Sequence, residues 1–146
     1  MKVKEQLRFM PSYYEKLRHL CLCRIEGDPI TWARPAGTFR RYDTQKDIKR
    51  QIAWQVKKEM IGKKPSKFPL LVELIFCIYS PKSINKRTKY PIFKKDIDNL
   101  QKLILDSCNA ITWDDDGQII DVHARKVWAD SKQTAQTILA VWEILE

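Results

Sequence analysis

The strongest strand signal in this chain is the stretch FPLLVELIFCIYSP, residues 68–81. In a β-strand, successive side chains point to opposite faces of the sheet. Val72, Leu74, Phe76 and Ile78 would therefore line one face, and most positions on the other face are apolar as well. Two apolar faces are typical of a strand that is covered on both sides. We predict that this segment is a central strand.

Further strand signals lie on both sides of this segment. Residues 21–37 indicate a strand, a turn at Gly27-Asp28-Pro29 and a second extended segment. Two more strands are predicted near the end of the chain, over about 118–128 and 134–145. Together with the central segment, these elements predict a sheet of about four to five strands.

Two helices are expected between these strands. The first would begin at the candidate cap Thr44, carry apolar residues at four-residue spacing and end at Gly62. The second would cover about 98–109, with Asp98 as its cap and Gln101 completing a capping box. Helices of this kind bury their apolar stripe against a sheet.

The order of these elements predicts an α+β fold. We expect a single two-layer domain over residues 20–146, in which helices pack on one face of a mixed sheet. Residues 1–19 would form a helical N-terminal extension.

The composition is that of a soluble domain with a large positive charge. The chain has 146 residues, a formal net charge of +9 and 44% hydrophobic residues. Such an excess of positive charge favours polyanionic partners, above all nucleic acid. No apolar run approaches the roughly 18–20 residues that span a bilayer, and the N-terminus lacks the pattern of a signal peptide. We therefore expect a cytoplasmic protein with no membrane partner.

Carboxylates are concentrated in the runs KKDIDNLQKLILD, residues 94–106, and WDDDGQIID, residues 113–121. If the chain is extended before the helix, Asp96 and Asp98 point the same way, with their Cα atoms roughly 6–7 Å apart. Two such carboxylates repel each other unless lysines or a divalent cation lie between them. Mg²⁺ binds one or two carboxylates together with waters and phosphate oxygens. Beside a basic loop, the acids predict metal-assisted phosphodiester hydrolysis, although each cluster alone could be a helix cap or a polar turn.

The runs D-I-D-N-L-Q-K-L-I-L-D and W-D-D-D-G-Q-I-I-D resemble the signature of the RusA family of Holliday junction resolvases. The similarity is close from Asp96 to about Lys126, and it extends more weakly to Arg34-Pro35 and to residues 70–79. It implies a homodimeric, magnesium-dependent endodeoxyribonuclease of bacterial or phage origin, with Mn²⁺ as a substitute metal. Such an enzyme resolves four-way DNA by paired symmetric nicks in recombination and repair.

The resemblance also implies roles for individual residues. By position, Asp96, Asp98 and Asp116 would be the catalytic acids that bind the metal, and the neighbouring Asp115 would assist. Lys102 matches a lysine that the family needs for cleavage. Because Lys102 lies one helical turn after Asp98, its ammonium could reach the same site.

A basic stretch, KSINKRTKYPIFKK at residues 82–95, precedes the first acid cluster. Its cations are expected to hold DNA phosphates, and such contacts position DNA without reading its bases. The expected DNA-binding residues are Lys82, Lys86, Arg87, Lys89, Lys94 and Lys95, together with Arg34.

Two alternatives remain open at the level of the sequence. In the first, the protein is a structure-selective DNA-binding protein without catalysis, and the acids are only caps and turns. In the second, it is a metal-dependent nuclease that acts on flaps, forks or other branched DNA. The same acids would serve that nuclease and a junction resolvase, so the residues do not separate the two.

Overall fold

The computed structural model describes residues 14–38, 40, 42–79, 88–92 and 95–146. Its elements are the strands β1 (Leu17–Glu26), β2 (Leu70–Ile78), β3 (Ile119–Trp128) and β4 (Gln136–Ile144), the α-helices α2 (Lys46–Glu59) and α4 (Ile97–Cys108), and the short 3-10 helices η1 (Asp116–Gln118) and η2 (Lys132–Thr134).

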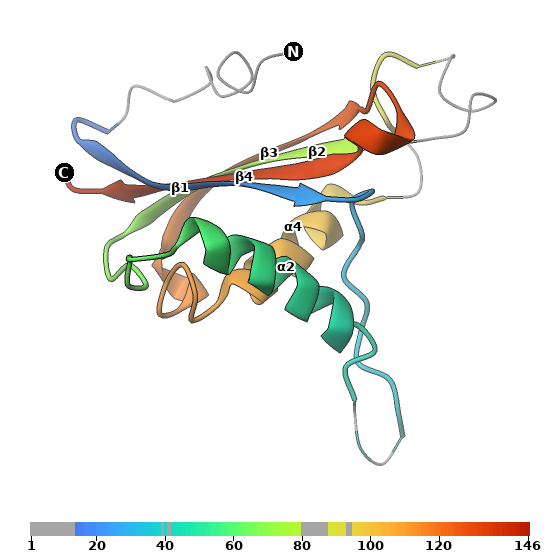
Figure 1. Ribbon diagram of the computed structural model, residues 1–146, viewed down its shortest axis with the longest axis horizontal. Coiled ribbons are helices and arrows are strands. Elements are labelled where there is room, and N and C mark those ends of the chain that lie inside the picture. The colour runs from blue at the N-terminus through green and yellow to red at the C-terminus, as the bar shows by residue number, and fades with distance from the viewer. Residues whose placement is uncertain (1–13, 39, 41, 80–87, 93–94) are drawn as a thin grey trace.

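The strands form one mixed sheet in the order β1-β4-β2-β3 (Figure 1). β4 runs antiparallel to both β1 and β2, whereas β2 and β3 are parallel. A parallel pair needs a crossover connection, and α4 with its flanking loops supplies it. All nine residues of β2 are buried. The predictions of a central strand and of an α+β fold with a mixed sheet are therefore confirmed.

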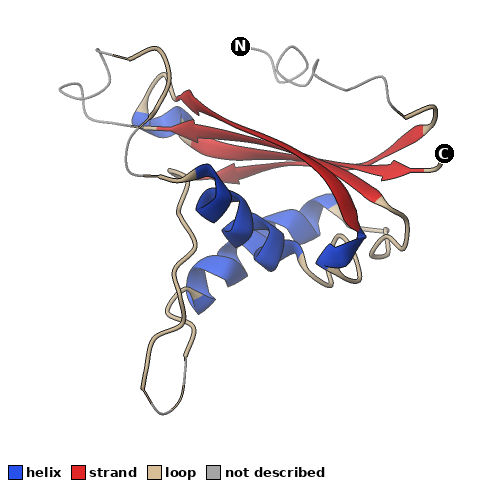
Figure 2. Ribbon diagram, turned by 180° about the vertical axis from the view of Figure 1, so that it is seen from behind, coloured by secondary structure: helices blue, strands red, loops and turns tan. Residues whose placement is uncertain are grey.

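Both α-helices pack on the same face of the sheet (Figure 2). α2 buries Ile52 and Val56, and α4 buries Leu100 and Leu103. These side chains share one core with the alternate residues of β2 that include Phe76. The four-residue spacing predicted for the first helix thus becomes the buried stripe of α2.

The other face of β2 carries Glu73 among apolar neighbours. Ile75 and Cys77 form a second, smaller apolar cluster there with Ile138 of β4. Glu73 is only 5% exposed, and burial raises the pKa of its carboxyl above the usual value, while His123 and other nearby groups oppose that shift. A carboxyl group in the middle of the central strand is therefore kept in a poorly solvated place.

The predictions about the helix starts are wrong in detail. α2 begins after Gln45, not after Thr44, and no side chain caps it. The residue that precedes α4 is Asp96, which is extended, and Asp98 lies inside the first turn. A carboxylate in the first turn is still favourable, because it faces the positive end of the helix dipole.

Two other segments differ from what the sequence predicts. After the turn at Gly27, the expected second extended segment does not join the sheet, and an isolated bridge pairs Ala36 with Tyr42. β1 begins at Leu17, so the end of the expected helical extension is strand, and residues 1–13 lie outside the described residues.

Among the helices described, none is both long and apolar enough to cross a membrane.

Candidate active site

The first acid pair lies at the start of α4. Asp96 is the N-cap residue in an extended conformation, and Asp98 belongs to the first turn of the helix. Both are exposed, and Asp96 makes no side-chain hydrogen bond that caps the helix. Carboxylate oxygens are the hard ligands that Mg²⁺ prefers. The chemistry of these two side chains therefore fits a magnesium ion that also binds a phosphate.

Contacts from the C-terminal ends of β2 and β3 fix the segment that precedes α4. The Lys126 ammonium in β3 donates a hydrogen bond of 2.9 Å to the carbonyl oxygen of Lys95. The Lys95 ammonium in turn donates to the Asp28 carboxylate at 2.6 Å and to the Pro29 carbonyl oxygen. Asp28 also accepts a hydrogen bond from the Tyr79 amide, just after β2. The Lys95 ammonium thus has two hydrogen-bond partners within the chain. The predicted contact of Lys95 with DNA stays a prediction.

The second acid cluster lies in a tightly bonded turn before β3. The Asp115 carboxylate accepts a hydrogen bond of 3.2 Å from the Gly117 amide, and the Gln118 side-chain oxygen accepts one of 2.9 Å from the Asp115 amide. The Gln118 side-chain nitrogen donates to the carbonyl oxygens of Ser66 and Phe68. Asp115 thus acts as a helix cap, whereas a role as a metal ligand stays a prediction.

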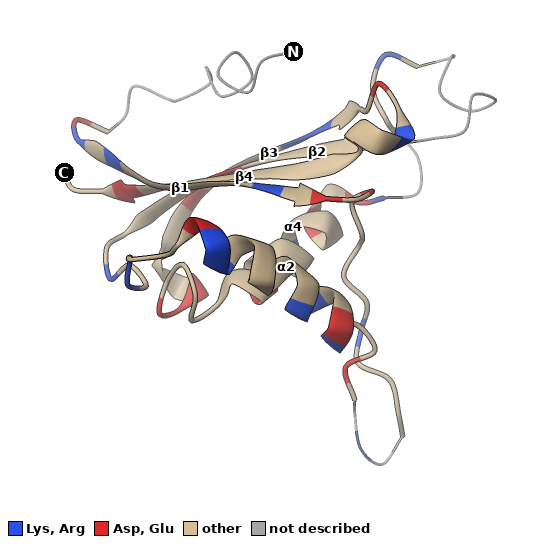
Figure 3. Ribbon diagram, in the orientation of Figure 1, with Lys and Arg blue, Asp and Glu red and all other residues tan. Residues whose placement is uncertain are grey.

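The two acid clusters lie at opposite ends of β3. Asp116 is the first residue of η1, the short 3-10 helix that leads into this strand, and Lys126, near the other end of β3, reaches the start of α4. Ile119 and Lys126 are seven positions apart, which corresponds to about 23 Å of strand. Figure 3 shows the acidic positions in both places. Within the described ranges, no three or more His, Cys, Asp or Glu side chains are grouped so that they could hold a metal ion. Within one chain, Asp116 therefore does not lie close to Asp96 and Asp98.

Lys102 lies one turn along α4 from the first acid pair, against an aromatic ring. Its ammonium is 3.7 Å from the centre of the Trp32 indole. The Trp32 amide donates a hydrogen bond of 2.9 Å to the carbonyl oxygen of Asn99 on the same helix. Sequence reasoning missed Trp32, because the loop that carries it is distant in sequence and has no recognisable motif.

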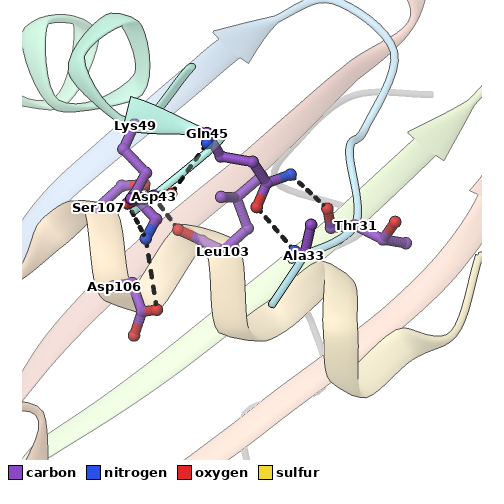
Figure 4. A network of polar contacts seen from close by, with 8 residues as sticks. All are labelled: Thr31, Ala33, Asp43, Gln45, Lys49, Leu103, Asp106 and Ser107. Carbon is purple, nitrogen blue, oxygen red and sulfur yellow. Dashed lines mark hydrogen bonds and ion pairs between the residues drawn. The ribbon is translucent and has the colours of Figure 1, made fainter. Parts of the chain in front are cut away.

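A buried glutamine holds the loop that carries Trp32 (Figure 4). The Gln45 side chain accepts a hydrogen bond of 2.7 Å from the Ala33 amide and donates one of 2.8 Å to the Thr31 carbonyl oxygen. The Gln45 amide donates to Asp43, and a hydrogen bond from Lys49 together with that amide lowers the pKa of the Asp43 carboxyl. The start of α2 is thereby bonded to the loop beside α4.

Of the expected DNA-binding residues, Arg34 and Lys89 are described and exposed. The Lys89 ammonium lies 5.5 Å from the centre of the Tyr90 ring. The other cations of the basic stretch, apart from Lys95, lie outside the described residues. They are Lys82, Lys86, Arg87 and Lys94.

Comparison with known proteins gives one result that bears on this site. The model of a protein family described as Endodeoxyribonuclease RusA matches residues 27–138. This range contains both acid clusters, Lys102 and the loop of Trp32, and it covers well over half of the chain. No curated protein matches the chain.

Proposed function

The chain belongs to the RusA endodeoxyribonuclease family, and from this premise we propose that it resolves Holliday junctions by paired symmetric nicks in a Mg²⁺-dependent reaction. The observation that carries the proposal is the family match across residues 27–138, which include the exposed pair Asp96 and Asp98 at the start of a rigidly anchored helix. Such an activity would serve DNA recombination and repair.

The proposed chemistry assigns a separate task to each group. Asp96 and Asp98 would hold Mg²⁺, which when bound polarises the phosphate and lowers the pKa of an attacking water. The Lys102 ammonium would offset the negative charge that develops on the phosphate oxygens during hydrolysis. Both tasks need side chains that DNA can reach, and Asp96, Asp98 and Lys102 are all exposed.

DNA would be held through its phosphates. The net charge of +9 favours a polyanion, and the exposed Arg34 and Lys89 offer cations outside the acid clusters. The predicted contacts of Lys82, Lys86, Arg87 and Lys94 are part of the same proposal. Such contacts fix the position of a junction and leave the choice of cleaved sequence to other interactions.

A homodimer is part of this proposal, because the acids are far apart within one chain. About 23 Å of strand, from Ile119 to Lys126, lies between the two acid clusters, and one Mg²⁺ ion, whose ligand distances are about 2.0–2.1 Å, cannot bridge such a length. We propose that the partner subunit's Asp116 joins Asp96 and Asp98. A two-fold axis would form this composite site twice, and two equivalent sites are what paired nicks in a four-way junction require.

The proposal can be tested with a labelled synthetic four-way junction. Intact protein and Asp98→Asn would each be incubated with the junction in Mg²⁺ or in EDTA. Asp47→Asn is the matched control, since Asp47 is also an exposed aspartate in the first turn of a helix, α2. We expect symmetric nicks from intact protein and from the control in Mg²⁺ alone. Asp98→Asn should bind the junction and leave it uncut.

The same assay addresses the two alternatives. A junction that is shifted on a gel but uncut in every condition would leave a structure-selective DNA-binding protein. Flap and fork substrates, run in parallel, would reveal a nuclease with another branched target, because they would then be cut at least as fast as the four-way junction. Normal cleavage by Asp98→Asn would exclude the proposed metal site.

A further inference from the structure

The contact between Lys102 and Trp32 joins an exposed lysine to a half-buried aromatic ring. The ammonium lies 3.7 Å from the ring centre, well within the roughly 6 Å over which an indole face attracts a cation. Trp32 also packs against the main apolar core, so its ring is supported from behind. The lysine therefore rests on a surface that belongs to the folded body of the protein.

The backbone around Trp32 is fixed on three sides. Its own amide is bonded to the Asn99 carbonyl oxygen on α4, and the Gln45 side chain bonds the Thr31 carbonyl oxygen and the Ala33 amide. Gln45 is 7% exposed and lies at the start of α2. One hydrogen bond to α4 and two to the residue that precedes α2 thus hold the indole at a set place beside Lys102.

We propose that Trp32 is a positioning residue for Lys102, and that its indole face holds the ammonium where it serves the scissile phosphate. A lysine has a flexible four-carbon stem and loses considerable conformational entropy when its ammonium is confined to one place. A fixed aromatic face reduces that loss in the reacting complex, because the ammonium is already confined before DNA binds. This inference rests on the catalytic role proposed above for Lys102.

The chain contains a matched control for this contact. On α2, the Lys58 ammonium lies 3.5 Å from the centre of the Trp54 ring, and Trp54 is 60% exposed. Trp54→Leu therefore removes the same kind of lysine–indole contact from a different helix. If the effect of Trp32 were only that of any such pair on helix stability, Trp54→Leu would reproduce it.

The test is a double-mutant cycle on the single-turnover cleavage rate of a four-way junction at saturating protein and Mg²⁺. The variants are Trp32→Leu, Lys102→Ala, the double variant and the control Trp54→Leu. Junction affinity is measured separately in EDTA, and the melting temperature of each variant is recorded. A further variant, Trp32→Phe, keeps an aromatic ring that attracts cations less strongly than an indole does. It replaces Trp32→Leu in the cycle with Lys102→Ala if Trp32→Leu does not fold.

We expect Trp32→Leu to lower the cleavage rate by about two- to thirtyfold, the range that corresponds to a lysine–indole contact, with little change in affinity. Trp32→Phe should fall between it and intact protein. In the Lys102→Ala background, neither change should lower the rate further.

Two results would overturn the inference while leaving the proposed function in place. One is a cleavage rate for Trp32→Leu equal to that of Trp54→Leu, although Lys102→Ala is slow. The other is a loss of the same size with and without Lys102, because Trp32 would then act independently of the lysine. Normal cleavage by Lys102→Ala would instead remove the proposed role of Lys102 itself, and the positioning role with it.

Discussion

The Lys126 ammonium and the Lys95 carbonyl oxygen are joined by a hydrogen bond of 2.9 Å, which links the C-terminal part of β3 to the start of α4. β3 pairs with β2 along its whole length, so it acts as a rigid spacer between Asp116 at one end and Asp96 and Asp98 at the other. A loop movement cannot close such a distance. A second copy of the chain offers a way to complete the site without unfolding the sheet.

The proposed shared site predicts complementation between two inactive variants. Asp98→Asn and Asp116→Asn should each abolish cleavage. When the two proteins are mixed under conditions that exchange subunits, a heterodimer contains one site with both substitutions and one site with neither. We therefore expect cleavage to return in the mixture, as nicks on one strand of the junction, and a gel of the labelled strands measures it.

Two controls give the complementation test its meaning. Mixing either variant with itself should restore nothing, and size-exclusion chromatography should show a dimer in each case. If each site were built within one chain, every site in the mixture would carry one substitution and no activity would return. A monomer that cleaves junctions would contradict the shared site directly.

The Gln45 side chain should contribute strongly to stability. Gln45→Ala removes the partners of the Thr31 carbonyl oxygen and the Ala33 amide, which lie in a partly buried place. We expect a loss of about 1–3 kcal/mol in the free energy of unfolding, measured by urea denaturation. Gln55→Ala is the control on the same helix, because its main contact, to the Glu26 amide, is exposed and water can replace it. Equal losses for the two variants would contradict the role of Gln45.

Glu73 should make the stability of the fold depend on pH. Burial raises the pKa of its carboxyl in the folded state above the usual value of 4.5, so the folded protein holds this proton more tightly than the unfolded chain does. Stability from this group is present below pH 4.5 and is lost as the pH rises through the raised pKa. Glu73→Gln should therefore melt at a higher temperature than intact protein at pH 7.5.

The pH dependence itself distinguishes this cause from a general change in packing. The difference in melting temperature between Glu73→Gln and intact protein should shrink as the pH falls toward 4, because the Glu73 carboxyl becomes protonated. Glu59→Gln, at an exposed position on α2, should show no such trend. A difference that is the same at pH 4 and at pH 7.5 would rule out burial of the charge as the cause.

The exposed cations should appear in the salt dependence of DNA binding. In EDTA, the logarithm of junction affinity should fall linearly with the logarithm of salt concentration. Arg34→Ala and Lys89→Ala should each reduce that slope by about one, the value expected for one lost phosphate contact. Lys95→Ala tests the predicted DNA contact of Lys95, whose ammonium is bound by Asp28 and Pro29. An unchanged slope would mean that the ammonium serves only these contacts within the chain. A reduced slope for Lys95→Ala would place that side chain on DNA.

The layers of this protein and the types of its elements follow from local sequence patterns. Two apolar faces on residues 68–81 predicted the central strand, and four-residue spacing predicted α2, because a strand or a helix needs such an apolar face to be buried. A capping pattern near Asp98 predicted α4. The same reading missed the helix starts at Gln45 and Asp96, since several polar residues in a row can serve as caps and the choice depends on what packs nearby.

The distribution of the chemical groups in space, by contrast, depends on contacts between distant parts of the chain. Asp116 follows Asp98 by only eighteen positions in the sequence. Because β2 and β3 are parallel, α4 crosses over the sheet between them, and the two acids lie toward opposite ends of β3. The tertiary structure also brought Trp32 to Lys102 and Lys95 to Asp28, and neither pair has a local signature. Such contacts depend on the register of the strands and the packing of the helices, and a periodic pattern specifies which face is buried but not what that face will meet.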